Sequence, residues 1–170
     1  MAVGVYKPHE YNKIMASTVK AKTLRVTIQE DIVLRGVNYG SKTKLNISEI
    51  NEISKRVVTV PASEVELIAM STAVASGTFI EGDVRYIRIT NLDDTNHIGL
   101  IFKNEDNDEF GIKLDYGQSF IYNADLSGGV VDTMEANAGA ISTNTFADLV
   151  NITAIADTAA CDVEVFVASV

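Results

Sequence analysis

The segment Cys161-Asp-Val-Glu-Val-Phe-Val167 alternates small apolar side chains with larger or charged ones, and this alternation decides the fold class. Successive side chains of a β-strand point to opposite faces. One face of this strand then carries four small apolar residues: Cys161, Val163, Val165 and Val167. The segment Leu24-Arg-Val-Thr-Ile-Gln29 repeats the period of two near the other end of the chain. We therefore expect a half-buried strand at each place.

Seven further segments have a strand-forming composition. Each is rich in Val, Ile, Thr, Tyr or Phe, and most are bounded by Gly, Asn or Asp. They are Arg56–Val60, Glu64–Met70, Val84–Thr90, Ile98–Lys103, Phe110–Leu114, Gln118–Tyr122 and Leu149–Ala156. Short strands joined by turns, with no helices between them, predict an all-β fold. We expect one antiparallel β-sandwich of jelly-roll type.

Two regions depart from the strand pattern. Residues 46–55 place three isoleucines at helical spacing, with Ser48 as a possible cap, so we expect a short helix there. The three are Ile47, Ile50 and Ile53. Residues 123–147 are rich in Ala, Gly, Ser, Thr and Asn, and we expect a long surface loop with one helical turn at Asp132–Asn137.

The expected domain organisation is simple. Residues 1–22 have no core pattern and predict an N-terminal arm, while residues 23–170 form a single sandwich domain that contains the long loop. A chain of 170 residues is long enough for one domain with a substantial core.

Charge is divided unevenly along the chain. Residues 1–60 contain ten Lys/Arg and five Asp/Glu, a net charge of +5, whereas residues 61–170 contain four and eighteen, a net charge of −14, which together give −9. Such asymmetry is typical of a protein that docks by one end. The candidate docking residues are five basic side chains within a stretch that holds a single acid, Glu10: Lys7, Lys13, Lys20, Lys22 and Arg25.

Composition also excludes several classes of protein. An overall charge of −9 argues against a nucleic-acid partner, because binding to phosphate backbones relies on Lys and Arg. Cys161 is the only cysteine, which fits folding in a reducing cytoplasm without an intrachain disulfide. The first residues lack the apolar region of a signal peptide, and we expect no membrane partner because no apolar run reaches the ~18 residues of a membrane span.

The residues that could carry chemistry have simpler structural interpretations. Acidic turns at 91–96 and 106–108 could offer oxygen ligands to Ca²⁺, but Asn and Asp are also the ordinary residues of hairpin turns. His9 and His97 have no Cys or second His at metal-ligand spacing. Ser119 lacks the closing glycine of a nucleophile elbow. We therefore predict no enzyme activity, no metal site and no cofactor, with Ca²⁺ at the turns left as an alternative.

Two further interpretations concern carbohydrates, one as a glycosidase and one as a sugar-binding protein. Glu64 and Glu66 are a carboxylate pair, as a glycosidase needs, yet residues i and i+2 of a strand simply share one solvated face. Tyrosines could stack on a sugar ring, although the chain has no Trp. Six are present: Tyr6, Tyr11, Tyr39, Tyr86, Tyr116 and Tyr122.

Three longer segments resemble small virion structural proteins of tailed bacteriophages, particularly of marine cyanophages. They are Asp83–His97, Phe110–Phe120 and Phe146–Ala156, within a similar region that spans about residues 60–168. The resemblance implies a non-enzymatic β-sandwich module of a capsid exterior, neck or tail, and it carries over no catalytic residue.

The resemblance and the charge pattern together predict a capsid decoration protein that docks on the major capsid lattice. It would be made in the host cytoplasm and incorporated into the virion. A neck or tail component, or a glycan- or receptor-binding head, are the alternatives. Shell proteins sit on local symmetry axes and sandwiches leave edge strands to cover, so we expect a homo-oligomer, with a trimer preferred.

Overall fold

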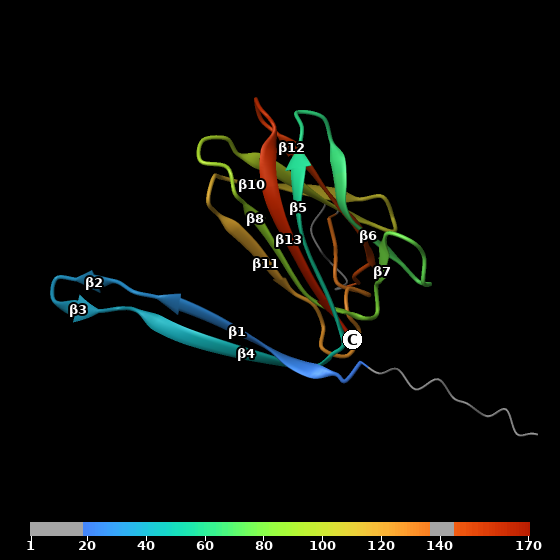
Figure 1. The fold of residues 1–170 in the computed structure, drawn as a ribbon, viewed down its shortest axis with the longest axis horizontal. Helices are drawn as coiled ribbons and strands as arrows, with labels where there is room; N and C mark the ends of the chain where they lie inside the picture. The colour runs from blue at the N-terminus through green and yellow to red at the C-terminus, as the bar shows by residue number, and fades with distance from the viewer. Residues whose placement is uncertain (1–18, 137–144) are drawn as a thin grey trace, which may run out of the picture.

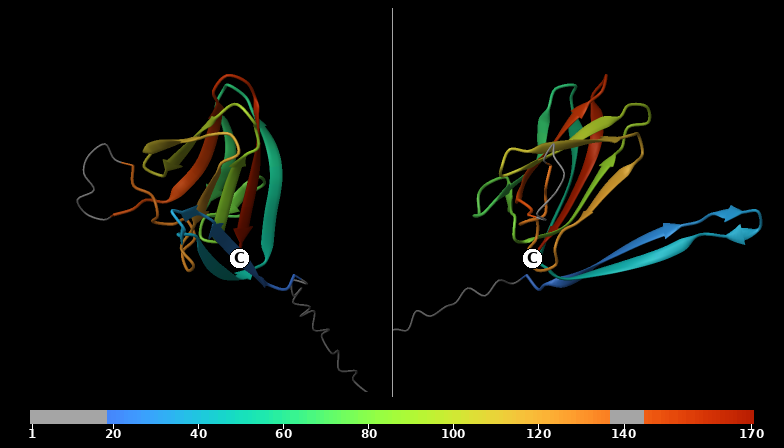
Figure 2. Two further views of the ribbon diagram at one scale, coloured as in Figure 1. Left: turned by 90° about the vertical axis from the view of Figure 1, so that its left-hand side faces the viewer. Right: turned by 180° about the vertical axis from the view of Figure 1, so that it is seen from behind.

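The computed structural model describes residues 19–136 and 145–170 and contains only strands, turns and irregular segments there (Figure 1). Two packed sheets form a body, and a long two-stranded ribbon projects from one end of it (Figures 1 and 2). No helix of these residues is long and apolar enough to cross a membrane.

Nine strands make up the body, in two sheets. The four-stranded sheet has the order β11-β8-β13-β5, and the five-stranded sheet has the order β10-β9-β12-β6-β7. Every pair is antiparallel except β6 with β7. The strands are β5 (Glu52–Val60), β6 (Val65–Ser71), β7 (Thr78–Ile80), β8 (Val84–Asn91), β9 (Ile98–Asn104), β10 (Glu109–Leu114), β11 (Ser119–Asn123), β12 (Leu149–Ala156) and β13 (Cys161–Ser169).

The core lies between the two sheets and is built by alternation. In β13 the four residues of the predicted apolar face are at most 1% exposed. Phe102 of the opposite sheet stacks on Phe110 at 4.7 Å between ring centroids and contacts Phe120 at 5.0 Å. The predicted antiparallel β-sandwich is confirmed, and each strand expected between residues 56 and 167 overlaps a strand of the body.

The expected helix at 46–55 is wrong. These residues form the end of β4 (Ser41–Ile50) and the start of β5, joined at Asn51. Ile47 and Ile50 are both buried, although they are three residues apart in a strand. The alternation is interrupted between them, because the register shifts opposite Lys22 and Leu24 and Glu49 has a positive φ of 64°. A β-bulge thus places two strand residues at the i, i+3 spacing that is also typical of one face of a helix.

The long loop contributes to the core. Val130 and Met134 are buried between the sheets, and backbone bridges link Asp125 to Gly129 and Met134 to Ala147. The helical turn expected at Asp132–Asn137 is absent over 132–136, while residue 137 lies outside the described residues. The segment is held on the body by its apolar side chains, which are buried between the sheets, and its described residues form no helix.

The ribbon consists of β1 (Lys22–Glu30) and β4, with the short strands β2 (Val33–Leu34) and β3 (Val37–Asn38) at its tip. β1 pairs with β4 alone and belongs to neither sheet of the body. The first strand of the body is therefore β5, at Glu52, and not a strand beginning at Thr23. The expected arm, residues 1–22, lies outside the described residues as far as residue 18, and the ribbon is a separate projection formed by residues 22–50.

Candidate docking site

A tight turn closes the ribbon at its tip. Arg35 and Gly36 both have positive φ, 52° and 80°, as a two-residue type I′ turn requires. Below them Val33 pairs with Asn38 and Leu34 with Val37, and the N–H of Tyr39 donates to the carbonyl of Ile32 at 3.0 Å. The turn residues and these pairs hold the tip as a defined hairpin.

The two faces of the ribbon differ in charge. Residues directly opposite one another in an antiparallel pair share a face. Arg25 lies opposite Asn46, Thr27 opposite Lys44, and Gln29 opposite Lys42. One face of the two paired strands therefore carries three basic side chains, Arg25, Lys42 and Lys44, and its only acidic neighbour among the described residues is Asp31, just beyond β1, which accepts a hydrogen bond from Gln29 at 2.9 Å. We call these three residues the basic face.

The other face of the ribbon is apolar at its base, where it packs on the body, and becomes polar at Thr43, Glu30 and Ser41. Leu24 faces Ile47 and Val26 faces Leu45 across the ribbon. Together they pack on the outer surface of the four-stranded sheet, against Tyr86, Ile121, Phe166 and Ala168. Tyr86 and Phe166 meet edge to face at 5.9 Å between centroids. This second, smaller core anchors the ribbon.

Towards the tip of the ribbon, the apolar side chains are no longer covered by the body and are exposed. Five large residues there are between 51% and 68% exposed. They are Ile32, Val33, Leu34, Val37 and Tyr39, and we call them the apolar tip. Contiguous exposed apolar residues mark interaction sites in soluble proteins. The ribbon thus combines a basic face with an apolar tip.

The structure describes three of the five predicted docking residues. Lys20, Lys22 and Arg25 are exposed, and Arg25 belongs to the basic face. Lys7 and Lys13 lie outside the described residues. Sequence reasoning missed Lys42 and Lys44, because their position beside Arg25 follows from the strand register. The alternation in Lys42-Thr-Lys44 was the one available signal for them.

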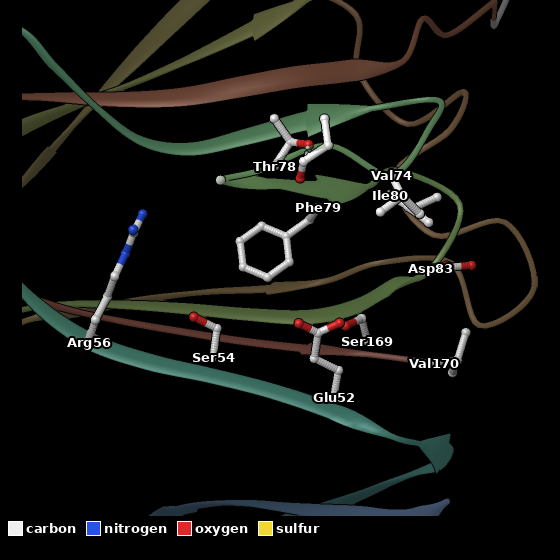
Figure 3. Close-up of a pocket in the computed structure, with 12 residues that line it drawn as sticks. Glu52, Ser54, Arg56, Val74, Thr78, Phe79, Ile80, Asp83, Ser169 and Val170 are labelled. Atoms are coloured by element: carbon white, nitrogen blue, oxygen red, sulfur yellow. Dashed lines mark hydrogen bonds between the residues drawn. The ribbon is translucent and has the colours of Figure 1, made fainter. Parts of the chain in front are cut away.

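A crevice of about 380 Å³ opens between the edge strands β5 and β7 (Figure 3). Phe79 and Val74 provide apolar contacts, while Glu52 and Asp83 bring carboxylates to its lining. Arg56 enters from β5 and donates a hydrogen bond to the carbonyl of Leu67. Histidine and cysteine are absent from the described lining, so the hydroxyls of Ser54, Ser169 and Thr78 have no such base beside them.

Two turn aspartates, Asp93 of the predicted acidic turn at 91–96 and Asp125, accept hydrogen bonds from their own turns, and at 106–108 the backbone N–H of Asp108 donates to Asn104 Oδ1 at 2.8 Å. Asp93 Oδ1 accepts the backbone N–H groups of Thr95 at 2.8 Å and Asn96 at 2.6 Å, and these bonds lower the pKa of Asp93. Asp125 Oδ1 accepts from the Ser127 hydroxyl and backbone N–H and from the Gly128 N–H, which lowers its pKa to about 2. Within 19–136 and 145–170, no three His, Cys, Asp or Glu side chains gather as a metal site.

The remaining candidate residues lie apart from one another. His97 Nδ1 is 3.6 Å from Asp157 Oδ2 in the turns at the end of the body away from the ribbon. Burial raises the pKa of the nearby Cys161 thiol, and neighbouring Asp93 raises it further. Tyr39 and Tyr116 are exposed, one at the ribbon tip and one in the β10–β11 turn, whereas Tyr86 is buried.

Glu64, directly before β6, accepts a hydrogen bond from the Thr153 hydroxyl of β12 at 2.6 Å, and Glu66 lies opposite Thr153 in the strand register. Ser119 shares a hydrogen bond with Thr90 at 2.8 Å on the paired strand β8. Both residues thus have partners within the sheets, and the ribbon remains the most distinctive surface of the described chain.

Comparison with known proteins gave no match, either to a protein-family model or to a curated protein sequence.

Proposed function

We propose that this protein is a non-enzymatic structural component of a tailed-phage virion, and that it decorates the capsid by docking on the major capsid lattice. The ribbon carries this proposal. A well-packed sandwich that extends a basic, apolar-tipped ribbon has the form of an assembly module, whose surfaces bind other proteins. The resemblance of three sequence segments to phage virion proteins supports a phage particle as the assembly.

The strand pairing supports a jelly roll as the fold of the body. Apart from the three-residue β7, the strands pair from the outside of the sequence inward: β5 with β13, β6 with β12, β8 with β11, and β9 with β10. This nested order is that of one long antiparallel hairpin rolled into two four-stranded sheets, which is the jelly-roll topology. Viral shell proteins commonly use it.

Charge supports docking through the N-terminal region. Residues 51–170 contain six Lys/Arg and nineteen Asp/Glu, a net charge of −13, and form the acidic body. The cluster from Lys7 to Arg25 is basic, and we propose that it binds the lattice, with the acidic body facing solvent. A neck or tail position remains the alternative within the same class.

Binding to empty shells that lack the protein tests this docking. Deleting residues 1–20 removes Lys7, Lys13 and Lys20 and stops before β1, so we expect a folded protein that no longer cosediments with shells. The control carries Lys55→Ser, Lys103→Ser and Lys113→Ser, which remove as many positive charges from the body. We expect the control to bind.

The same binding experiment is repeated at increasing salt concentration. The Debye length falls from about 10 Å at 0.1 M salt to about 3 Å at 1 M, so association steered by these charges weakens as salt rises. Unchanged binding of the truncated protein would show that the N-terminal residues are not the anchor, and binding of neither full-length nor control protein would count against a decoration role.

A further inference from the structure

We propose that the ribbon of one copy docks on the body of a second copy of this chain, with the apolar tip seated in a hollow on the outer face of the second copy's five-stranded sheet. This inference goes beyond the capsid role and does not depend on it, because it needs only the purified protein.

The ribbon leaves most of its outer half uncovered. A two-stranded hairpin alone is at best marginally stable in water. Its own body covers the base as far as Val26 and Leu45, and Ile28, the next residue on that face, is already exposed. Beyond it the ribbon extends away from the body, so that no other described segment of the chain lies beside the tip (Figures 1 and 2). A second molecule seated on the tip would bury these side chains.

The proposed acceptor is a largely apolar surface, with His97, Lys113 and Asp157 also in its lining. A shallow hollow of about 510 Å³ lies over Gly99 of β9 and Gly111 of β10 on the outer face of the sheet. Neither glycine carries a side chain there, so the surface is lowered between Ile101 and Ile155, which line the hollow. Ile155 is partly exposed. Apolar side chains from a second molecule would bury this surface.

Charge complementarity favours a second copy as the partner. The ribbon, residues 22–50, has five Lys/Arg and three Asp/Glu, whereas the acidic body has a net charge of −13. Four basic residues of the body form ion pairs within the body. They are Lys55 and Arg88 with Glu164, Lys103 with Glu109, and Lys113 with Asp115. Among the described residues, those of the basic face form no ion pair. They are thus available to an acidic neighbour.

The proposed contact can join several copies in a ring. From Lys22 to the turn the ribbon is about 40 Å long, at about 3.3 Å for each strand residue, which is enough to reach a neighbouring body. Donor and acceptor are different surfaces, so the contact is heterologous, and heterologous contacts that close give cyclic oligomers. A ring of this kind agrees with the trimer expected for a shell protein.

Light scattering on the purified chain gives the first test. We expect the wild-type protein to exceed its monomer mass of 18.4 kDa. Leu34→Asp places a charge in the apolar tip and should weaken self-association at least tenfold. Val74→Asp, at a body residue that is 86% exposed outside the proposed contact, should leave the mass unchanged. Circular dichroism verifies that each variant is folded.

Cysteine cross-linking tests which surfaces meet. A mixture of the Leu34→Cys and Ile155→Cys variants should form disulfide-linked dimers under mild oxidation, whereas Leu34→Cys mixed with Val74→Cys should not. The native Cys161 is buried and does not compete. A monomeric wild-type protein, equal cross-linking to both partners, or dimers from Leu34→Cys alone would each overturn the proposal, the last because it would place tip against tip.

Discussion

Leu24 and Ile47 lie directly opposite each other at the base of the ribbon, and Ile47 is buried to 1% exposure where the ribbon meets the body. Four residues along the same strand face, the equivalent apolar position is Ile28, which is 40% exposed. One face of one strand thus passes from core to solvent over a short distance. The ribbon is anchored on the body at its base and exposed to solvent towards its tip.

We expect Ile47→Ala to lower the free energy of unfolding by about 2–4 kcal/mol, since it leaves a cavity against Tyr86 and Ala168. Ile28→Ala is the matched control on the same face and should cost no more than about 0.5 kcal/mol. Urea denaturation measures both. Equal losses would show that the base of the ribbon is not part of the cooperative fold.

Gly129 connects the long loop to the body at a point with no room for a side chain. A Cβ there would lie 2.1 Å from the carbonyl oxygen of Glu81, and φ is +68°. We expect Gly129→Ala to cost the left-handed strain of about 1–2 kcal/mol and about 1–3 kcal/mol more for the overlap. Gly117→Ala, with a similar φ and open space, should cost only the strain. Similar melting temperatures for the two variants would contradict this account of the loop.

Asp125 gives the protein an acid-sensitive contribution to stability. Hydrogen bonds from Ser127 and Gly128 lower its pKa from 3.8 to about 2 in the folded state. The ionised form is therefore favoured by folding, and its contribution is complete above about pH 4 and is lost as pH falls towards 2. Asp125→Ala should be less stable than the parent at pH 6, with the difference shrinking through this range in denaturation curves.

Ser127→Ala refines the same experiment. It removes the hydroxyl that makes the largest contribution to the shift, so the pKa of folded Asp125 should lie closer to 3.8. The stability lost on acidification should then be smaller than in the parent protein, and the loss should be complete at a higher pH. A difference between parent and Asp125→Ala that stayed constant from pH 6 to pH 2 would contradict the assignment.

Cys161 is expected to be chemically inert in the folded protein. Burial raises the pKa of its thiol, and the thiolate is the reactive form. An aromatic disulfide reagent at pH 8 should leave the native protein unmodified and titrate one thiol after unfolding in guanidinium. Rapid reaction of the native protein would show that the β12–β13 end of the sandwich opens readily.

The body could be predicted from the sequence because its strands carry their burial pattern locally. In β13, alternation alone identifies the buried face, and turn residues mark the ends of β8, β9 and β10. These signals do not depend on which strand lies beside which. The order of strands in the sheets, by contrast, follows from packing between distant segments.

The ribbon could not be predicted in the same way. β1 has the pattern of a core strand, yet its apolar face is shared between the body and solvent. Lys42 and Lys44 join Arg25 on one face only through the register of β1 and β4. The bulge at Glu49 gave Ile47 and Ile50 the spacing of a helix. Each of these features arises from pairing across the hairpin, which local sequence does not specify.

The copy number of this protein per purified particle tests the central claim most directly. Symmetry-resolved cryo-electron microscopy, checked by quantitative mass spectrometry against the major capsid protein, measures it. We predict copies on the order of hundreds over the shell, grouped about its local symmetry axes, as a lattice of repeated subunits requires. A dozen copies or fewer at one vertex would assign it to the neck or tail, and its absence from purified particles would contradict a virion role altogether.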